Sequence, residues 1–401
     1  MQARRLPLAL IAPIALACST DGTQSLAVTR DSAGIQIVEN QAPDSTTPNF
    51  RLGEEPILTL GELDGAEAEQ FGYVTGARRL STGRIVVADR NNYELRLFDS
   101  SGALVRRVGR RGEGPGDFGE LAALLGGPPG IHTWDWRLHR VTSFAEDGTF
   151  LRDRKIAYLP APDSSPGRAV PFPLHVLADG RIVARGGRMR FNTPTGNYRD
   201  SLDVWIVDST GDMRRFGAYY ARSHYVLHTP DGSMWFGMKP FGPRGETLVT
   251  DAELIRSDGA VFEIRYLTHL DSLMRIVRVQ RSVATVTENH RAWYMDSVIA
   301  DYPAEFHEAE RRANAWAEWS STVPAYDRLL QDSEGLTWAR IYPYDSADAA
   351  WDVFDGAGRL VASASTPSAL DVQQIGPDWL LAQSKGEMDE PLVHLYVLTR
   401  N

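Results

Sequence analysis

The sequence predicts an all-β fold, a six-bladed β-propeller with a small helical insertion between blades four and five. Two observations support this prediction: units of short apolar runs joined by glycine turns recur along the chain, and they recur at a nearly regular interval. Repeats of some tens of residues, each long enough for several strands, are typical of propeller blades. The turns that open the units lie at positions 83, 130, 180, 232, 335 and 378.

The clearest unit spans residues 81–109. Two apolar runs, 85–89 and 94–98, are followed by the turn Asp99-Ser-Ser-Gly102 and a third run, 103–108. The aspartate can accept hydrogen bonds from backbone N–H groups of the turn, and Gly102 can adopt a left-handed conformation that a Cβ disfavours. One such turn would suit any all-β protein, including a sandwich, but five copies with matched flanks favour a propeller.

The interval between positions 232 and 335 is about twice the others and predicts the insertion. Residues 285–288 fit a helix capping box, and 290–300 contain neither Gly nor Pro. Residues 304–319 are rich in Ala and Glu, with Phe306, Ala309 and Trp316 on one apolar face. We expect helices at about 285–320. Packing of this face on the propeller is favoured over a lid or a partner-docking element.

The N-terminus predicts a bacterial lipoprotein. Residues 1–17 fit a signal peptide, with Arg4 and Arg5 before an apolar stretch, and Ala15-Leu-Ala-Cys18 resembles a lipobox. Cys18 is the only cysteine, so we expect it to be lipidated and the mature domain to have no disulfides. We expect a flexible tether at 18–33 and the propeller at 34–401. The protein would be anchored in the cell envelope, on the periplasmic face or outer membrane; plain secretion after cleavage at Ala17 is the alternative.

Closure of the ring is expected to involve both ends of the chain. The last unit, which begins near position 378, is degenerate and lacks an outer strand. The apolar runs 34–38 and 56–60 are expected to supply the missing outer strands, because a closed ring leaves no exposed sheet edge.

The charge balance argues against nucleic acid as a partner. The net charge is −10, and −12 (40 basic against 52 acidic residues) once residues 1–17 with their two arginines are removed. The arginines are scattered instead of forming a stripe. We expect a monomer that binds an envelope protein or a small polar ligand and contacts the membrane only through its lipid.

The two segments that resemble motifs for phosphate or metal binding each lack a required part. The glycine-rich segment 109–116 joins strand to strand without a following helix, so it is not a phosphate loop. The segment 307–311 begins like a zinc-protease helix, but Arg311 stands where the second histidine would be. No catalytic residue, metal site or cofactor is therefore assigned.

The chain resembles the NHL-repeat group of six-bladed propellers at Asp89, Leu97-Phe-Asp99, Gly102 and residues 109–118. The resemblance spans most of residues 70–400, although the repeats here are longer than typical NHL units. It implies a disc with a central channel, which this group uses mainly for binding and in some branches for hydrolysis or lyase chemistry.

Candidate site residues come from the innermost strand of each blade, which precedes the opening turn and lines the channel. These strands are expected at 74–80, 118–125, 172–177, 224–229, 325–331 and 370–375. Their polar side chains are candidates for a binding site at the channel mouth: Arg78, Glu120, His175, His224, Tyr225, Tyr326, Asp327, Arg328 and Asp371. Such a mixture suits an anionic or sugar-like ligand better than Ca²⁺, which prefers a ring of carboxylates. The alternative is that they line a wet channel and satisfy one another.

The sequence thus favours an envelope-anchored binding or scaffolding lipoprotein. The alternative is a propeller hydrolase or lyase, similar to a lactonase or esterase, with its site at the central channel mouth. A third hypothesis is a small-ligand sensor with the helical insertion as a lid.

Overall fold

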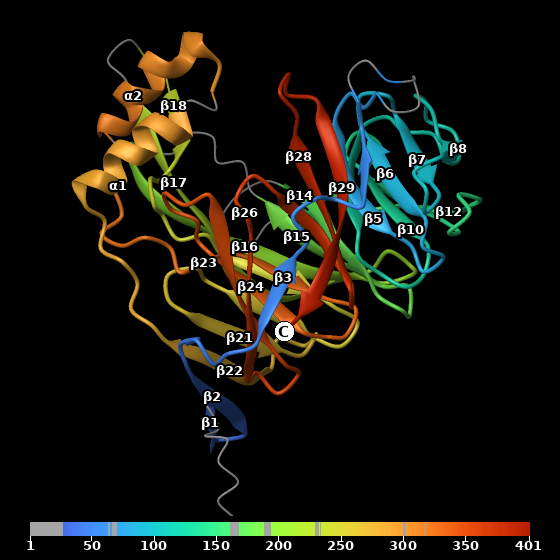
Figure 1. Ribbon diagram of the computed structural model, residues 1–401. Coiled ribbons are helices and arrows are strands. Elements are labelled where there is room, and N and C mark those ends of the chain that lie inside the picture. The colour runs from blue at the N-terminus through green and yellow to red at the C-terminus, as the bar shows by residue number, and fades with distance from the viewer. Residues whose placement is uncertain are drawn as a thin grey trace, which may run out of the picture.

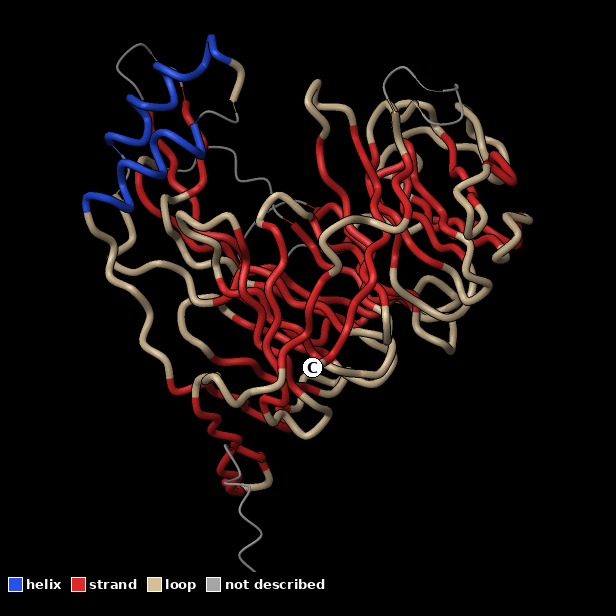
Figure 2. Tube along the Cα trace, viewed as in Figure 1, coloured by secondary structure: helices blue, strands red, loops and turns tan. Residues whose placement is uncertain are grey.

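A computed structural model describes residues 27–62, 65, 70–160, 168–187, 194–228, 232, 234–299, 302–316 and 318–401. Within these residues the strands form six blades around an axis, and the helices lie together at one side (Figure 1, Figure 2). The predicted six-bladed propeller is confirmed. The predicted signal peptide, 1–17, and Cys18 lie outside the described residues.

Blades one and two are four-stranded antiparallel sheets in which the chain starts at the axis and moves outward. Their middle strands are buried along their whole length, because neighbouring blades cover both faces. Blade one consists of β5 (Val74–Arg79), β6 (Ile85–Asp89), β7 (Glu94–Phe98) and β8 (Leu104–Val108). Blade two consists of β9 (Leu121–Leu125), β10 (Ile131–Asp135), β11 (Arg140–Phe144) and β12 (Phe150–Lys155).

An aspartate at the end of the second strand fastens each of these two blades to the segment that enters it. Asp89 accepts a hydrogen bond from the backbone N–H of Gly72 (3.0 Å), and Asp135 accepts one from Gly119 (2.7 Å). A buried carboxylate needs such donors. Asp89, one of the residues on which the predicted resemblance rests, therefore has a structural role.

Blade three carries the longest strands of the described part of the chain. It consists of β14 (Arg168–Val176), β15 (Ile182–Gly187), β16 (Gly196–Val207) and β17 (Met213–His228), with β13 (Leu159–Pro160) and β18 (Met234–Met238) at its two edges. Beyond the blade, residues 196–199 of β16 pair with 223–226 in the segment 223–228 of β17, and β18 pairs with 224–228. We call these three segments the arm.

The innermost strand of blade four differs from the predicted one. Residues 224–228 belong to β17, and the turn at Gly232 leads to β18, so the segment 224–229 is not an innermost strand. The blade consists of β19 (Glu246–Val249), β20 (Leu254–Ser257), β21 (Glu263–Leu267) and β22 (Leu273–Gln280). The turn after β19 contains no glycine and is stabilised by the hydroxyl of Thr250, which accepts hydrogen bonds from the N–H groups of Ala252 (3.2 Å) and Glu253 (3.1 Å).

Blades five and six close the ring. Blade five consists of β23 (Tyr326–Gln331), β24 (Thr337–Ile341), β25 (Asp348–Phe354) and β26 (Leu360–Pro367). Blade six consists of β27 (Asp371–Ile375), β28 (Trp379–Lys385), β29 (Pro391–Arg400) and, as its outer strand, β4 (Leu58–Leu60). Each innermost strand contacts the next, and β27 contacts β5. Closure by the run 56–60 is confirmed.

The other N-terminal run was predicted wrongly. β2 (Ile35–Gln41) lies parallel to β22 at the outer edge of blade four and not in blade six. β1 (Ala27–Ser32) forms a hairpin with β2, so this part of the predicted tether is a strand. β3 (Asn49–Leu52) runs parallel to β26 and antiparallel to β29, and it joins blades five and six into one sheet.

The hydrophobic core is divided among the interfaces between neighbouring blades. Phe98 of blade one packs with Leu381 and Leu395 of blade six, and Leu97 packs with Leu121 of blade two. Each blade is therefore stabilised mainly by its neighbours, as expected for stacked repeats.

The predicted helical insertion is confirmed between blades four and five. It contains α1 (Glu288–Trp293), the π-helical turn η1 (Tyr294–Val298), the 3₁₀ turn η2 (Ala304–Phe306) and α2 (His307–Trp316). None of the helices in the described residues is long and apolar enough to cross a bilayer. The capping box pairs Thr287 with His290, two residues later than predicted.

The insertion packs through a different set of aromatic residues from the one predicted. Trp293, Tyr294 and Trp319 surround Phe241. Phe306 and Trp316, which were expected to pack inward, are 49% and 77% exposed.

The insertion and the arm lie side by side at the top of Figure 1, and the Asn197 amide donates to Glu318 (2.8 Å) between them. β14 is the innermost strand of blade three, and β16, whose first residues belong to the arm, begins on the same side of the ring as β14. The arm therefore projects from the side on which the innermost strands start. We call that end of the axis the arm mouth and the other end the far mouth.

Truncating Leu60 should test the closing strand. Its side chain is only 3% exposed and packs between blades one and six. We expect Leu60→Ala to lower the free energy of unfolding by about 2–5 kcal/mol, measured by urea denaturation. The control Ile57→Ala changes the residue just before β4, whose side chain is 62% exposed, and should change this free energy by less than about 0.5 kcal/mol. Equal effects of the two substitutions would contradict this role of β4.

Candidate functional site

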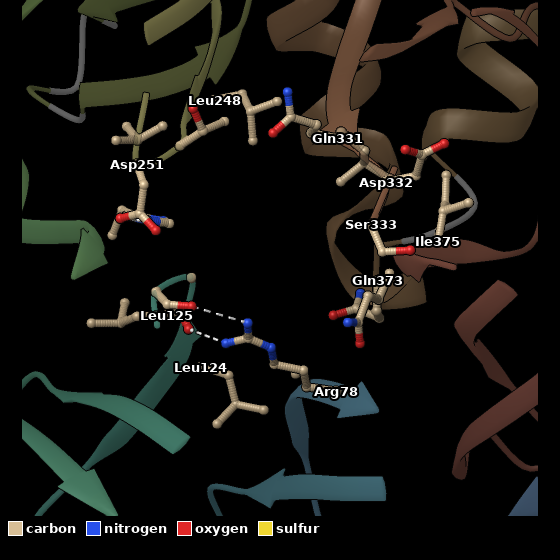
Figure 3. A pocket seen from close by; sticks show the side chains of 18 of the residues that line it. Arg78, Leu124, Leu125, Leu248, Asp251, Gln331, Asp332, Ser333, Gln373 and Ile375 are labelled. Carbon is tan, nitrogen blue, oxygen red and sulfur yellow. Dashed lines mark hydrogen bonds and ion pairs between the residues drawn. The ribbon is translucent and has the colours of Figure 1, made fainter. Parts of the chain in front are cut away.

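A cavity of about 680 Å³ lies on the axis toward the far mouth (Figure 3). All six blades contribute to its lining through the ends of their innermost strands or the turns that follow. Its polar lining includes one arginine, one histidine next to an aspartate, and neutral amide and hydroxyl groups: Arg78, His175, Asp251, Gln331, Ser333 and Gln373.

Arg78 provides the positive charge of the cavity. It comes from β5, and its guanidinium donates to the carbonyl oxygens of Leu125 (3.1 Å) and Gly127 (3.4 Å) in blade two, as Figure 3 shows. Burial lowers the pKa of Arg78, and Glu146 opposes this effect. An arginine nevertheless stays protonated in a protein, so the cavity wall carries a fixed cation.

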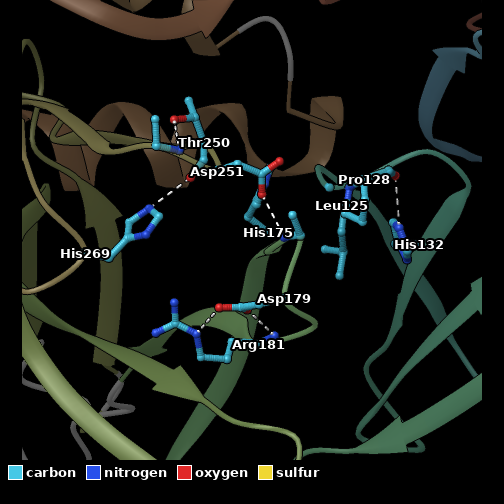
Figure 4. A network of polar contacts seen from close by, with 12 residues as sticks. Leu125, Pro128, His132, His175, Asp179, Arg181, Thr250, Asp251 and His269 are labelled. Carbon is cyan, nitrogen blue, oxygen red and sulfur yellow. Dashed lines mark hydrogen bonds and ion pairs between the residues drawn. The ribbon is translucent and has the colours of Figure 1, made fainter.

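His175 and Asp251 meet across the interface of blades three and four (Figure 4). His175 Nε2 lies 3.4 Å from Asp251 Oδ1, and the same oxygen accepts the N–H of Ala178 (2.9 Å). Burial lowers the pKa of His175 and outweighs the opposing effect of Asp251. Gly126 packs against the other ring nitrogen, since a Cβ at this glycine would lie 2.5 Å from Nδ1. The imidazole is therefore held in place, with both nitrogens facing protein atoms.

The remaining carboxylate of the lining has a structural role. Asp332 accepts hydrogen bonds from the indole N–H of Trp338 (2.9 Å) and from the backbone N–H of Leu336 (2.8 Å). Among the described residues no three His, Cys, Asp or Glu side chains gather closely enough to hold a metal ion. The cavity can thus recognise a ligand through Arg78 and neutral hydrogen-bonding groups.

The arm mouth contains three of the other predicted residues. Arg328 lies 2.9 Å from Asp371, and Asp327 accepts two hydrogen bonds from Arg340 (2.8 and 3.1 Å). These charged groups come from blades five and six at the start of their innermost strands. They lie at the end of the axis opposite the cavity that holds Arg78 and His175.

The other candidates lie away from the axial cavity. Glu120 forms an ion pair with Arg90 between blades one and two. Tyr326 is fully buried and donates to Asp352 (2.6 Å), which places it in the core.

His224 and Tyr225 are part of the arm, because they belong to β17 and not to an innermost strand. The His224 ring stacks on Tyr198 and contacts Phe236. The prediction that His224 and Tyr225 line the channel is therefore wrong, because both lie in the arm.

Sequence reasoning also missed residues that line the axis. Asp251 follows β19, and Glu246 begins it, but this innermost strand was not recognised because the turn after it contains no glycine. The signal that could have found β19 is the Thr-x-x-Glu turn at 250–253, which directly follows the short apolar pair Leu248-Val249. Gln331, Ser333 and Gln373 lie on or beside correctly predicted innermost strands and were overlooked because they are uncharged.

Comparison with known proteins supports the fold. A model of the family described as DUF5128, a 6-bladed beta-propeller, matches residues 71–125, which cover blade one and β9. No curated protein matches this chain in sequence.

Several solved structures have a similar fold. A DUF4221 family member from Bacteroides vulgatus has a TM-score of 0.52 at 11% identity, covering 88% of this chain and 99% of that chain. A candidate exported protein from Bacteroides fragilis has a TM-score of 0.48 at 14% identity, with coverages of 91% and 99%. Virginiamycin B lyase from Staphylococcus aureus has a TM-score of 0.41 at 10% identity, with coverages of 87% and 99%. The first of these supports the propeller fold, and none defines an activity.

A buried histidine behind the cavity wall makes stability depend on pH. His132 contacts Ser143 Oγ through Nδ1 (2.9 Å) and the Pro128 carbonyl through Nε2 (3.3 Å; Figure 4). Burial lowers the pKa of His132 from 6.5 to about 4. The folded state therefore favours the neutral ring, whereas the unfolded chain binds a proton near pH 6.5.

We expect the free energy of unfolding to fall as the pH drops from 6.5 to about 4, with His132 contributing about 3 kcal/mol of the loss. His132→Gln, which keeps polar atoms but does not titrate, should flatten this dependence in urea denaturation at pH 7 and pH 4.5. Some dependence should remain, because burial also lowers the pKa of His175 and His394. An unchanged pH profile in the variant would show that His132 is not the group that titrates.

Proposed function

We propose that this protein is a binding protein of the bacterial cell envelope that holds a small polar ligand in its axial cavity. The observation that supports this most is the lining of that cavity, where one guanidinium, Arg78, is combined with the neutral groups of Gln331, Ser333 and Gln373. Ligand sites are typically concavities of 300–1,000 Å³ with a few polar groups that orient the ligand, and this cavity measures about 680 Å³.

The chemistry of the lining favours a sugar acid. A guanidinium pairs well with a carboxylate, while amides and hydroxyls can exchange hydrogen bonds with sugar hydroxyl groups. Asp251, whose side chain is 50% exposed, adds an acceptor at the rim. A neutral sugar would leave Arg78 without a charged partner in the ligand and should therefore bind less tightly.

A hydrolase or lyase is the second candidate, and the His175–Asp251 pair is the observation that favours it. A histidine oriented by a carboxylate is a common general base. The geometry makes this role secondary, because Nε2 faces Asp251 and Nδ1 faces Gly126, so neither nitrogen is directed at a ligand in the cavity.

Binding can be tested by isothermal titration calorimetry with D-glucuronate and D-glucose. We expect glucuronate to bind more tightly than glucose because of Arg78. Ser333→Trp should fill the cavity and weaken glucuronate binding at least tenfold, since Ser333 is exposed in its turn and lines the cavity.

The matched control is Glu334→Trp, the next residue of the same turn, which is exposed and not part of the lining. It should bind glucuronate like the wild type. Failure of both sugars to bind, or equal binding by Ser333→Trp and wild type, would argue against a ligand site in this cavity. Turnover of a glucuronate ester that is lost in His175→Asn would instead favour the enzyme.

The envelope location is proposed from the N-terminal segment. Cys18 is the chain's only cysteine and stands where a lipoprotein is modified. β1 lies at the bottom of Figure 1, and α1 and α2 lie at the top. A lipid on Cys18 would therefore attach the molecule at the end away from the insertion.

Detergent partitioning can test the anchor. We expect the wild type, expressed in a bacterium with its signal peptide, to enter the Triton X-114 phase because of its acyl chains. Cys18→Ser should move to the aqueous phase, and Ser19→Ala should behave like the wild type. Partitioning of Cys18→Ser into detergent would rule out lipidation at this residue.

A further inference from the structure

The arm mouth brings together arginines from blades three and four. Arg185 lies on β15, Arg222 on β17, and Arg244 just before β19. The backbones of Arg222 and Arg244 pair in an isolated antiparallel bridge. Three guanidiniums thus start from adjacent segments at the base of the arm.

Two of these arginines are oriented by aromatic rings. The Arg185 guanidinium lies 4.7 Å from the ring centre of Phe172, and that of Arg244 lies 5.1 Å from the ring centre of Tyr342. Stacking on an aromatic face holds the planar group in one orientation and leaves its N–H groups free to bind a partner.

The nearby carboxylates are largely committed to other arginines. Asp327 forms two hydrogen bonds with Arg340 and lies 3.9 Å from Arg244, and Asp371 pairs with Arg328 at 2.9 Å. In the described part of the chain, Arg185 and Arg222 have no carboxylate within 4.0 Å.

The remaining acid, Glu246, does not balance the charge. Burial raises the pKa of Glu246, and Arg328 and Arg222 only partly oppose this effect. Burial also lowers the pKa of Arg222, and the neighbouring charges of Arg244 and Arg185 add to it. The direction for Arg222 is the one expected beside other positive charges, whereas that for Glu246 reflects its burial.

The cluster is therefore positive in an acidic protein. Five guanidiniums stand against three carboxylates, an excess of two positive charges, whereas the whole chain carries −10. The members are Arg185, Arg222, Arg244, Arg328 and Arg340 with Glu246, Asp327 and Asp371. Like charges held this close repel one another unless an anion lies between them.

We propose that the arm mouth binds a compact oxyanion group of a small ligand, a carboxylate or a phosphate, between Arg185, Arg222 and Arg244. Arginine suits both groups, because its fork of N–H donors matches two oxygens at once. This site lies at the opposite end of the axis from the cavity of the proposed function and does not depend on it.

The test uses two probes, citrate and inorganic phosphate, titrated into the mature protein by calorimetry at low salt. We expect at least one to bind, and the one that binds identifies the oxyanion. Arg222→Gln should weaken its binding about tenfold or more, because a hydrogen bond to a charged group is lost. Arg185→Gln should weaken it as well.

The matched control is Arg214→Gln, an exposed arginine at the other end of the same strand, β17. It should bind the probe like the wild type, and so should Ser333→Trp, whose change lies in the axial cavity. Thermal melting should show that all variants are folded. Failure of both probes to bind, or equal weakening by Arg214→Gln and Arg222→Gln, would overturn the proposal.

Discussion

The pairing of β4 with β29 is the interaction on which the rest of the structure depends. Only three residue pairs join these strands, with Leu58 opposite Leu395 and Leu60 opposite Val393. They nevertheless complete blade six and cover an edge that would otherwise be open. His394 reinforces the join, because its ring nitrogens lie 3.0 Å from the hydroxyl of Thr59 on β4 and 2.8 Å from that of Ser384 on β28. The axial cavity exists only because six innermost strands meet in a closed ring.

The same innermost strands give the two ends of the axis different chemistry. β23 carries Asp327 and Arg328 where it starts, at the arm mouth, and Gln331 where it ends, beside the cavity. The arm mouth is consequently rich in charged pairs, whereas the cavity relies on Arg78 and neutral groups. Charge is segregated along the axis by position in the strand, so one short element can serve two kinds of ligand.

Local turn chemistry made most of the fold predictable from the sequence. Gly83 and Gly335 have φ of 82° and 84°, a conformation that favours glycine, and both turns follow innermost strands. The turn after β19 contains no glycine and is held by the Thr250 hydroxyl, so this innermost strand was not predicted, and neither were Asp251 and Glu246. The pairing of β2 with β22 joins residues more than 230 positions apart, as in the Gln36–Arg275 pair, and no local pattern encodes such a partner. Arg185 and Arg222 were missed for a different reason, since they belong to the second and fourth strands of blade three and candidates were taken only from innermost strands.

The attachment of β2 to blade four determines how the molecule would respond to a mechanical load. The chain passes through β1, β2 and β3 before it reaches β4. Asn40, near the end of β2, is buried. Its side chain donates to the carbonyl of Gly358 (3.0 Å) and accepts the N–H of Leu360 (2.9 Å), so it also attaches β2 to blade five. A pull on the segment before Ala27 must peel β1 from β2 and shear β2 from β22 before any force arrives at the closing strand. The pairings of β1 with β2 and of β2 with β22 would therefore bear such a load first and protect the β4–β29 pairing that closes the ring.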